Sequence, residues 1–396
     1  MRTPQRSLPL LAFALVLAGP AMAGDRWQTE WNLRLRQEQV DDAAFDRDAN
    51  ATTLRLRAGL RANFSEHWSA LLEGEGVAGA GAFNDGSNGR VRYPAVIDPE
   101  GIELNQAWLR WQATHGSATL GRQRVLIDNQ RWVGNVGWRQ NEQTFDAIAT
   151  EWQLRPSLIA RYAWLDRVHR VNSDDALDPL ARERRLDTHL LNLAWKHGAQ
   201  QLTSYAYLHD DRDLASASTA TWGLRWIGAR LRDGNGWGWT LEAARQQDYA
   251  GNPVSFSHAY WLLEPTFAIG GVTWRAGWEH LGGDGAHALQ TPLATLHVFN
   301  GWADKFGVTP ASGLEDRYLG AGGKFGSGWY ADKFNWIVAW HDYRADRGGR
   351  YGTEWNASLG FPVHGAVSGL VKLADYRSDG YARDTRKLWL QLEWTH

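Results

Sequence analysis

The chain has 396 residues, no cysteine and a formal net charge of −2 at pH 7. The lack of cysteine excludes disulfides and thiolate metal sites, and the lack of a basic excess gives no case for nucleic acid as a partner. The 24 tryptophans are several times the content of a soluble domain, although the mean hydropathy of −0.47 is polar. Amphipathic aromatic side chains are useful at a membrane–water interface, so the composition favours a membrane protein.

Residues 1–23 have the pattern of a secretory signal peptide. Arg2 and Arg6 form a positive region, Leu8 to Ala18 an apolar run, and Ala21 to Ala23 a small-residue cleavage site. The alternative is a short membrane anchor, but the apolar run is shorter than the ~20 residues that a bilayer requires. We therefore expect the rest of the chain to be exported.

Residues 24–396 fall into segments of about ten residues that alternate between apolar and polar side chains. In 31–36, for example, Leu33 and Leu35 alternate with Arg34 and Arg36. No stretch approaches the ~18 apolar residues of a helical span, so any membrane crossing requires a closed β-barrel. We predict an all-β, transmembrane, antiparallel barrel of the outer-membrane type, formed by 24–396 as a single domain. The expected strands number about 18, with 16 possible, and lie at 26–38, 51–64, 67–78, 102–114, 117–127, 143–154, 157–167, 186–197, 199–210, 218–231, 236–248, 257–268, 271–281, 314–325, 331–343, 352–361, 365–376 and 384–395.

A soluble β-sandwich would also alternate, but two features favour the barrel. Tryptophan recurs at the apolar positions, often near segment ends, as an interfacial girdle requires. The opposite face carries Arg, Glu, Gln and Gly, which suits an aqueous lumen. Longer intervals are candidate outer loops, and short turns at 155–156, 198 and 232–235 are expected to face the periplasm. The candidate outer loops are 79–101, 128–142, 168–185 and 282–313.

One of these intervals belongs to an unusual stretch, Gly121 to Asp146, in which charges are mixed with Trp132, Trp138 and Phe145. The charges are unsuited to a buried strand, and the large aromatic side chains are not needed in a solvated loop. We predict that 129–141 folds over the pore and that the two ends of the stretch belong to the barrel wall.

Four segments carry a resemblance to a known family: 105–111 (NQAWLRW), 121–124 (GRQR), 129–146 (NQRWVGNVGWRQNEQTFD) and 290–325. In these segments the chain resembles the alginate-export family of outer-membrane porins. The resemblance implies an outer-membrane β-barrel, whose type member is an 18-stranded exporter that passes an anionic polysaccharide through an Arg-rich pore.

Guanidinium groups are permanently charged and bind carboxylates, so inward-facing arginines would form a path for an anion. Acidic residues in the same lumen would form ion pairs with these arginines and hold them in place. A structural Arg–carboxylate network is the favoured interpretation for any single arginine, and a cationic constriction for the set. The predicted pore-lining residues are Arg34, Arg36, Arg55, Arg57, Arg61, Arg122, Arg124, Arg131, Arg139, Asp146, Arg161, Arg225, Glu242, Arg275 and Lys324.

We therefore predict a porin in the outer membrane of a Gram-negative bacterium that passes an anionic or polar solute by passive diffusion. An acidic poly- or oligosaccharide is the first expectation, and uptake of small organic acids or sugars is the alternative. A barrel-borne hydrolase or a purely structural barrel are alternatives from other classes, but no Ser–His pair is singled out, and no catalytic residue, metal or cofactor is expected. The expected partners are outer-membrane lipid, the solute and periplasmic secretion components.

Overall fold

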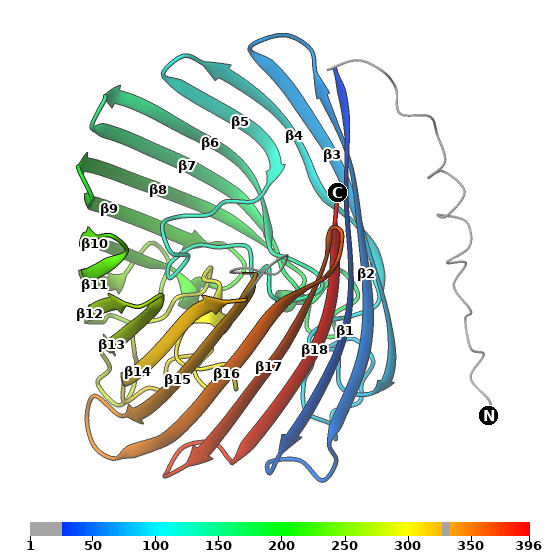
Figure 1. The fold of residues 1–396 in the computed structure, drawn as a ribbon, viewed down its shortest axis with the longest axis vertical. Coiled ribbons are helices and arrows are strands. Elements are labelled where there is room, and N and C mark those ends of the chain that lie inside the picture. The colour runs from blue at the N-terminus through cyan, green and yellow to red at the C-terminus, as the bar shows by residue number, and fades with distance from the viewer. Residues whose placement is uncertain (1–25, 327–332) are drawn as a thin grey trace.

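The computed structural model describes residues 26–326 and 333–396, so the predicted signal peptide at 1–23 lies outside the described residues. The described chain forms one 18-stranded antiparallel sheet that closes on itself, because β1 pairs with both β2 and β18 (Figure 1). The predicted antiparallel barrel is confirmed. Its strands are β1 (Trp27–Asp42), β2 (Ala49–Asn63), β3 (Trp68–Ala82), β4 (Gly101–Ala113), β5 (Gly116–Gln123), β6 (Thr144–Arg155), β7 (Leu158–His169), β8 (Glu183–His197), β9 (Gln200–Asp211), β10 (Thr219–Arg232), β11 (Asn235–Asp248), β12 (Ser257–Ile269), β13 (Val272–Leu281), β14 (Leu314–Phe325), β15 (Phe334–Arg344), β16 (Arg350–His364), β17 (Val367–Ser378) and β18 (Thr385–Thr395).

The strands show the inverted polarity of a membrane barrel. On β1, Leu33 and Leu35 are 38% and 43% exposed on the outside, whereas the intervening Arg34 and Arg36 are buried on the inside. Successive side chains of a strand point to opposite faces, so the apolar set faces lipid and the polar set faces the lumen. The same alternation recurs around the barrel. Because β1 pairs with both β2 and β18, the sheet has no edge strand.

The connections divide the barrel into two ends. Turns such as 114–115, 156–157 and 198–199 are short, while the opposite end carries the longer connections. Short turns are typical of the periplasmic end and long loops of the extracellular end. Three short 3₁₀ helices, η1 (Pro179–Ala181), η2 (Ala215–Ala217) and η3 (Leu296–Val298), lie in these loops. Within residues 26–326 and 333–396, no helix is long and apolar enough to cross a membrane.

Two of the long connections enter the barrel. Loop 3 comprises residues 124–143, between β5 and β6, and loop 7 comprises residues 282–313, between β13 and β14. The backbones of the two loops pair at Val133 and Leu293, and the Gly134 N–H donates to the Leu293 carbonyl at 2.9 Å. Both loops run inside the ring of strands in Figure 1. The predicted inward fold of 129–141 is confirmed, whereas 282–313, predicted as an outer loop, also folds inward.

The interior of the barrel holds the hydrophobic core, packed between these loops and the wall. Phe145, Leu165 and Leu314 from the strands and Leu289 and Leu293 from loop 7 are almost fully buried in one cluster. Their burial removes apolar surface from water and fixes the loops within the lumen.

Candidate functional site

Four arginines of the barrel wall hold the backbone of loop 3. Arg34 and Arg36 on β1 donate to the carbonyl oxygens of residues 137–139 at distances of 2.6–3.3 Å. Arg55 and Arg57 on β2 donate to the next carbonyl of the loop, at 3.4 and 3.1 Å. A loop inside a lumen has no ladder to satisfy its peptide groups, and a guanidinium group offers five donors. We call these four residues the loop-facing arginines.

Carboxylates of the wall, of loop 3 and of the 83–100 connection between β3 and β4 balance the loop-facing arginines. Each carboxylate reaches an arginine within ion-pair distance, so most of the positive charge on this side of the lumen is neutralised. The pairs are Arg34–Glu393 (3.0 Å), Arg55–Glu393 (3.3 Å), Arg57–Glu142 (3.5 Å), Arg36–Asp98 (3.8 Å) and Arg57–Glu75. This is the Arg–carboxylate network that sequence reasoning favoured for individual arginines.

Glu142 anchors the end of loop 3. Its carboxylate accepts from the Asn105 amide at 2.7 Å and from the Arg124 guanidinium at 2.5 Å. Burial alone would raise the pKa of Glu142, but Arg57 and Arg124, together with the hydrogen bonds from Arg124 and Asn105, lower it to about 2. The group is therefore ionised at neutral pH. Because β5 ends at Gln123, Arg124 belongs to loop 3 and not to the wall, where the sequence placed it.

On the far side of the lumen, loop 3 contacts carboxylates. The Trp132 indole N–H donates to Glu242 of β11 at 2.9 Å, and Glu242 also accepts from the Tyr205 hydroxyl at 2.6 Å. Arg225 of β10 lies 3.4 Å from the same carboxylate. Because β11 lies far around the ring from β1, these contacts show that loop 3 spans the lumen (Figure 1).

The other two arginines of loop 3, Arg131 and Arg139, are also paired. Arg131 Nε lies 2.9 Å from Glu279 of β13, and Arg139 Nη1 lies 3.2 Å from Glu38 of β1. Burial lowers the pKa of Arg139, but the carboxylates of Glu38, Asp98 and others outweigh it and raise that pKa overall. Both side chains are buried, and they fix the loop where the sequence predicted a solute-contacting position.

Loop 7 is held by residues that the sequence did not single out. Glu354 of β16 accepts from the Trp302 and Ala303 backbone N–H groups at 2.6 and 2.8 Å. Asp304 of the loop accepts from Lys387 of β18 at 2.7 Å. These partners are far apart in the chain, so spacing carries no signal for them. The only indication was that 290–325 belongs to the segments of family resemblance.

A buried lysine joins both loops to the wall. The Lys372 ammonium nitrogen on β17 lies 4.0 Å from the ring centre of Trp138 in loop 3 and 3.9 Å from that of Trp302 in loop 7. Such contacts attract a cation to the ring face. Lys372 also lies 2.6 Å from His297 Nε2, while Asp304 lies 2.7 Å from His297 Nδ1. Burial, opposed by Asp304 and assisted by Lys372, lowers the pKa of His297 to about 3.

A second set of cations lines the lumen near the short-turn end. We call Arg61, Arg161, Arg275 and Lys324 the vestibule cations. The first three have acidic partners but remain partly exposed, with 30–55% of each side chain accessible. Lys324 is exposed and forms no ion pair with a described residue. The partners are Glu30 for Arg61 (2.7 Å), Glu151 for Arg161 (2.6 Å) and Glu264 for Arg275 (3.5 Å).

Two predicted pore residues face the other way. Arg122 and Asp146 are register partners, two residues along the strands from the Leu120–Ile148 pair, whose side chains are exposed to the outside. Residues two apart on a strand share a face. Arg122 and Asp146 therefore lie on the outer face at the loop end, 3.0 Å apart, and Asp146 also contacts His169 at 2.9 Å. The predicted inward position is wrong because the outward side is solvated beyond the lipid, so charge is not excluded there.

Comparisons with known proteins agree with this architecture. Residues 25–280 match the sequence model of the family described as "Alginate export". A comparison with curated proteins finds no significant match.

Several solved structures share the fold at low identity. The chain is similar to Pseudomonas aeruginosa OpdO, with 16% identity, a TM-score of 0.72 and coverage of 94% of this chain and 97% of that one. P. aeruginosa OpdK with vanillate gives 15% identity, a TM-score of 0.70 and coverage of 94% and 98%. Acinetobacter baumannii OccAB3 gives 12% identity, a TM-score of 0.72 and coverage of 93% of this chain and 99% of that one.

Proposed function

The chain belongs to the alginate-export family and is an outer-membrane channel, and from this premise we propose that it passes a small organic solute that bears a carboxylate. The observation that carries the proposal is the clamping of loop 3 from both sides of the lumen. Arg36 of β1 and Glu242 of β11 hold it at opposite walls, and loop 7 packs against it. A lumen crossed by two fixed loops favours small, individually recognised solutes.

Two cations exposed to water, Arg275 and Lys324, support an anionic solute. Arg275 is 55% exposed in its side chain, whereas its partner Glu264 is 16% exposed. Lys324 is exposed without an ion-pair partner among the described residues. A passing carboxylate can therefore meet guanidinium and ammonium groups that are accessible, and the weak, multiple contacts allow release as well as entry. One of the structural matches, OpdK, is described with bound vanillate, which is itself a small carboxylate.

An acidic polysaccharide is the second candidate, because the matching family is described as "Alginate export". The carboxylates of successive sugars of a polyuronate would bind the same guanidinium groups in turn. It would have to thread as an extended single chain past loops 3 and 7, which makes the fixed loops an obstacle for the polymer but not for a monomer.

Planar-bilayer recordings on the purified full-length protein test the proposal. We expect anion-selective conductance, with added vanillate producing resolvable current blockades at lower concentration than uronate oligomers. Blockade by uronate oligomers with no response to small carboxylates would favour the polysaccharide. Cation-selective conductance would contradict both candidates.

A further inference from the structure

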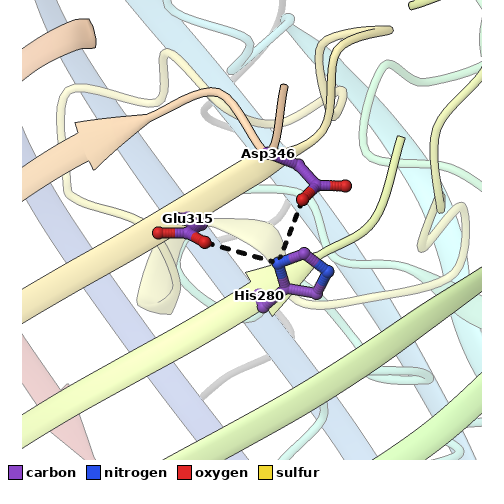
Figure 2. A group of neighbouring side chains, drawn as sticks. All are labelled: His280, Glu315 and Asp346. Carbon is purple, nitrogen blue, oxygen red and sulfur yellow. Dashed lines mark ion pairs between the residues drawn. The ribbon is translucent and has the colours of Figure 1, made fainter. Parts of the chain in front are cut away.

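Three potential metal ligands gather at the extracellular rim, away from the lumen. His280 lies near the end of β13, Glu315 near the start of β14, and Asp346 in the loop 345–349 between β15 and β16. His280 shares its side of β13 with the exposed Trp278, so the cluster lies on the outer face of the barrel. Figure 2 shows both carboxylates directed at the same nitrogen of the imidazole ring.

The spacing of these atoms does not suit direct hydrogen bonds. His280 Nδ1 lies 4.0 Å from Glu315 Oε1 and 3.9 Å from Asp346 Oδ1, beyond the range of an N–H···O bond. The side chain of His280 is only 11% exposed, and Nδ1 is buried without a hydrogen-bond partner among the described residues. A buried ring nitrogen that points at two carboxylate oxygens and bonds to neither requires an explanation.

Each ligand group is held from behind by a second contact. The other oxygen of Glu315 accepts from Arg317 at 2.7 Å, and the other oxygen of Asp346 accepts from the Gly283 N–H at 3.2 Å. The imidazole ring of His280 stacks on Trp261, with centroids 5.2 Å apart and an interplanar angle of 9°. Each carboxylate thus uses one oxygen within the protein and presents the other to the imidazole, as metal ligands with supporting contacts do.

We propose that His280, Glu315 and Asp346 bind a divalent transition-metal ion of the Zn²⁺ class. One imidazole nitrogen and two carboxylate oxygens suit Zn²⁺, which accepts N and O ligands at about 2.0–2.2 Å, whereas Ca²⁺ takes oxygen ligands. Two ligands of one Zn²⁺ lie at most about 4.2 Å apart, and the two distances from Nδ1 fall within that limit. All three ligand atoms lie within 4.8 Å of one another, so the carboxylates close by a few tenths of an ångström on binding. Water completes the coordination.

The bound ion would tie together the base of loop 7. Asp346 already contacts Gly283 at the start of the loop, and its neighbour Arg347 donates its backbone N–H to Ser312 at the end of the loop, at 3.2 Å. His280 and Glu315 flank the same loop in the sequence. An ion shared by these three residues therefore fixes the position from which loop 7 enters the lumen.

Calorimetric titration of the untagged, full-length protein in detergent with ZnCl₂ tests the site. We expect one Zn²⁺ to bind with at least about tenfold higher affinity than Ca²⁺, and His280→Ala to weaken that binding by about tenfold or more. His287→Ala, which removes a histidine of loop 7 outside the cluster, is the matched control and should bind as the wild type does.

Glu315→Gln keeps the shape of the side chain and provides a second variant if His280→Ala does not form the barrel, as judged by heat-modifiable gel migration. We expect it to weaken Zn²⁺ binding as well. Unchanged Zn²⁺ affinity in a folded His280→Ala or Glu315→Gln protein would overturn the proposal, and so would Ca²⁺ binding as tight as that of Zn²⁺.

Discussion

Arg57 and Arg61 lie four residues apart on the same face of β2, yet they are in different surroundings. Arg57 is buried against Glu75, Glu142 and a carbonyl of loop 3. Arg61, nearer the periplasmic end, pairs only with Glu30, and 32% of its side chain is exposed. The same side chain on the same strand therefore positions a loop in one place and faces water in the other.

The comparison extends to the two sets of cations. Loss of one partner from a buried ion pair costs about 3–5 kcal/mol, because a charge is left without compensation. Exposed pairs contribute about 0–1 kcal/mol. The loop-facing arginines are thus expected to determine the shape of the constriction, and the vestibule cations its preference for anions.

Arg36→Ala should have the largest effect. Arg36 is fully buried, lies 4.1 Å from the ring centre of Trp138, and donates to its carbonyl oxygen and to Gln391. Its loss leaves Asp98 without its arginine partner on β1, so we expect destabilisation by about 3–5 kcal/mol and a higher single-channel conductance as loop 3 moves. Urea unfolding and bilayer recordings measure the two effects.

Arg61→Ala is the matched control for this experiment, since it removes an arginine of the neighbouring strand that is partly exposed. Its unfolding should change by about 1 kcal/mol or less. Equal destabilisation by both variants would contradict the division into two sets.

Glu354→Ala should free the Trp302–Ala303 segment of loop 7 from the barrel wall. Two backbone N–H groups, of the partly buried Trp302 and the buried Ala303, would lose their acceptor. Leaving buried donors unsatisfied costs about 1–3 kcal/mol each, so we expect frequent transitions between conductance levels in single-channel records. Glu354→Gln retains an acceptor oxygen and should lie between Glu354→Ala and the wild type. A quiet Glu354→Ala channel would show that other contacts suffice to hold the loop.

Protonation of His297 at acidic pH should favour release of loop 7 from the barrel wall. Its pKa of about 3 in the folded protein is lower than the ~6.5 of a free imidazole, so the released loop binds the proton more readily. Protonation therefore favours release as the pH falls from about 6.5 towards 3, by about 2 kcal/mol at pH 5. We expect conductance noise to rise between pH 7 and pH 5. His297→Gln should remove this dependence, and an unchanged pH response in that variant would assign it to another group.

The strands and the path of loop 3 were predictable from the sequence because alternation and the Trp-rich mixture are local patterns. Alternation from Leu120 and Ile148 would also have placed Arg122 and Asp146 outside, but their charge suggested the lumen. The sequence could not show that the loop-facing arginines are neutralised, since their partners, such as Glu393, lie hundreds of residues away. Loop 7 was missed for the same reason: Glu354 and Lys372 hold it across long separations.

The reversal potential of a vestibule variant tests the division of the cations most directly. Arg61→Gln, Arg161→Gln and Arg275→Gln combined leave Glu30, Glu151 and Glu264 without their arginine partners. We expect the reversal potential in a KCl gradient to shift towards cation selectivity, with the unfolding transition unchanged and the conductance levels still resolved. An unchanged reversal potential in this triple variant, together with a shift in Arg36→Ala, would contradict the account by assigning selectivity to the loop-facing arginines.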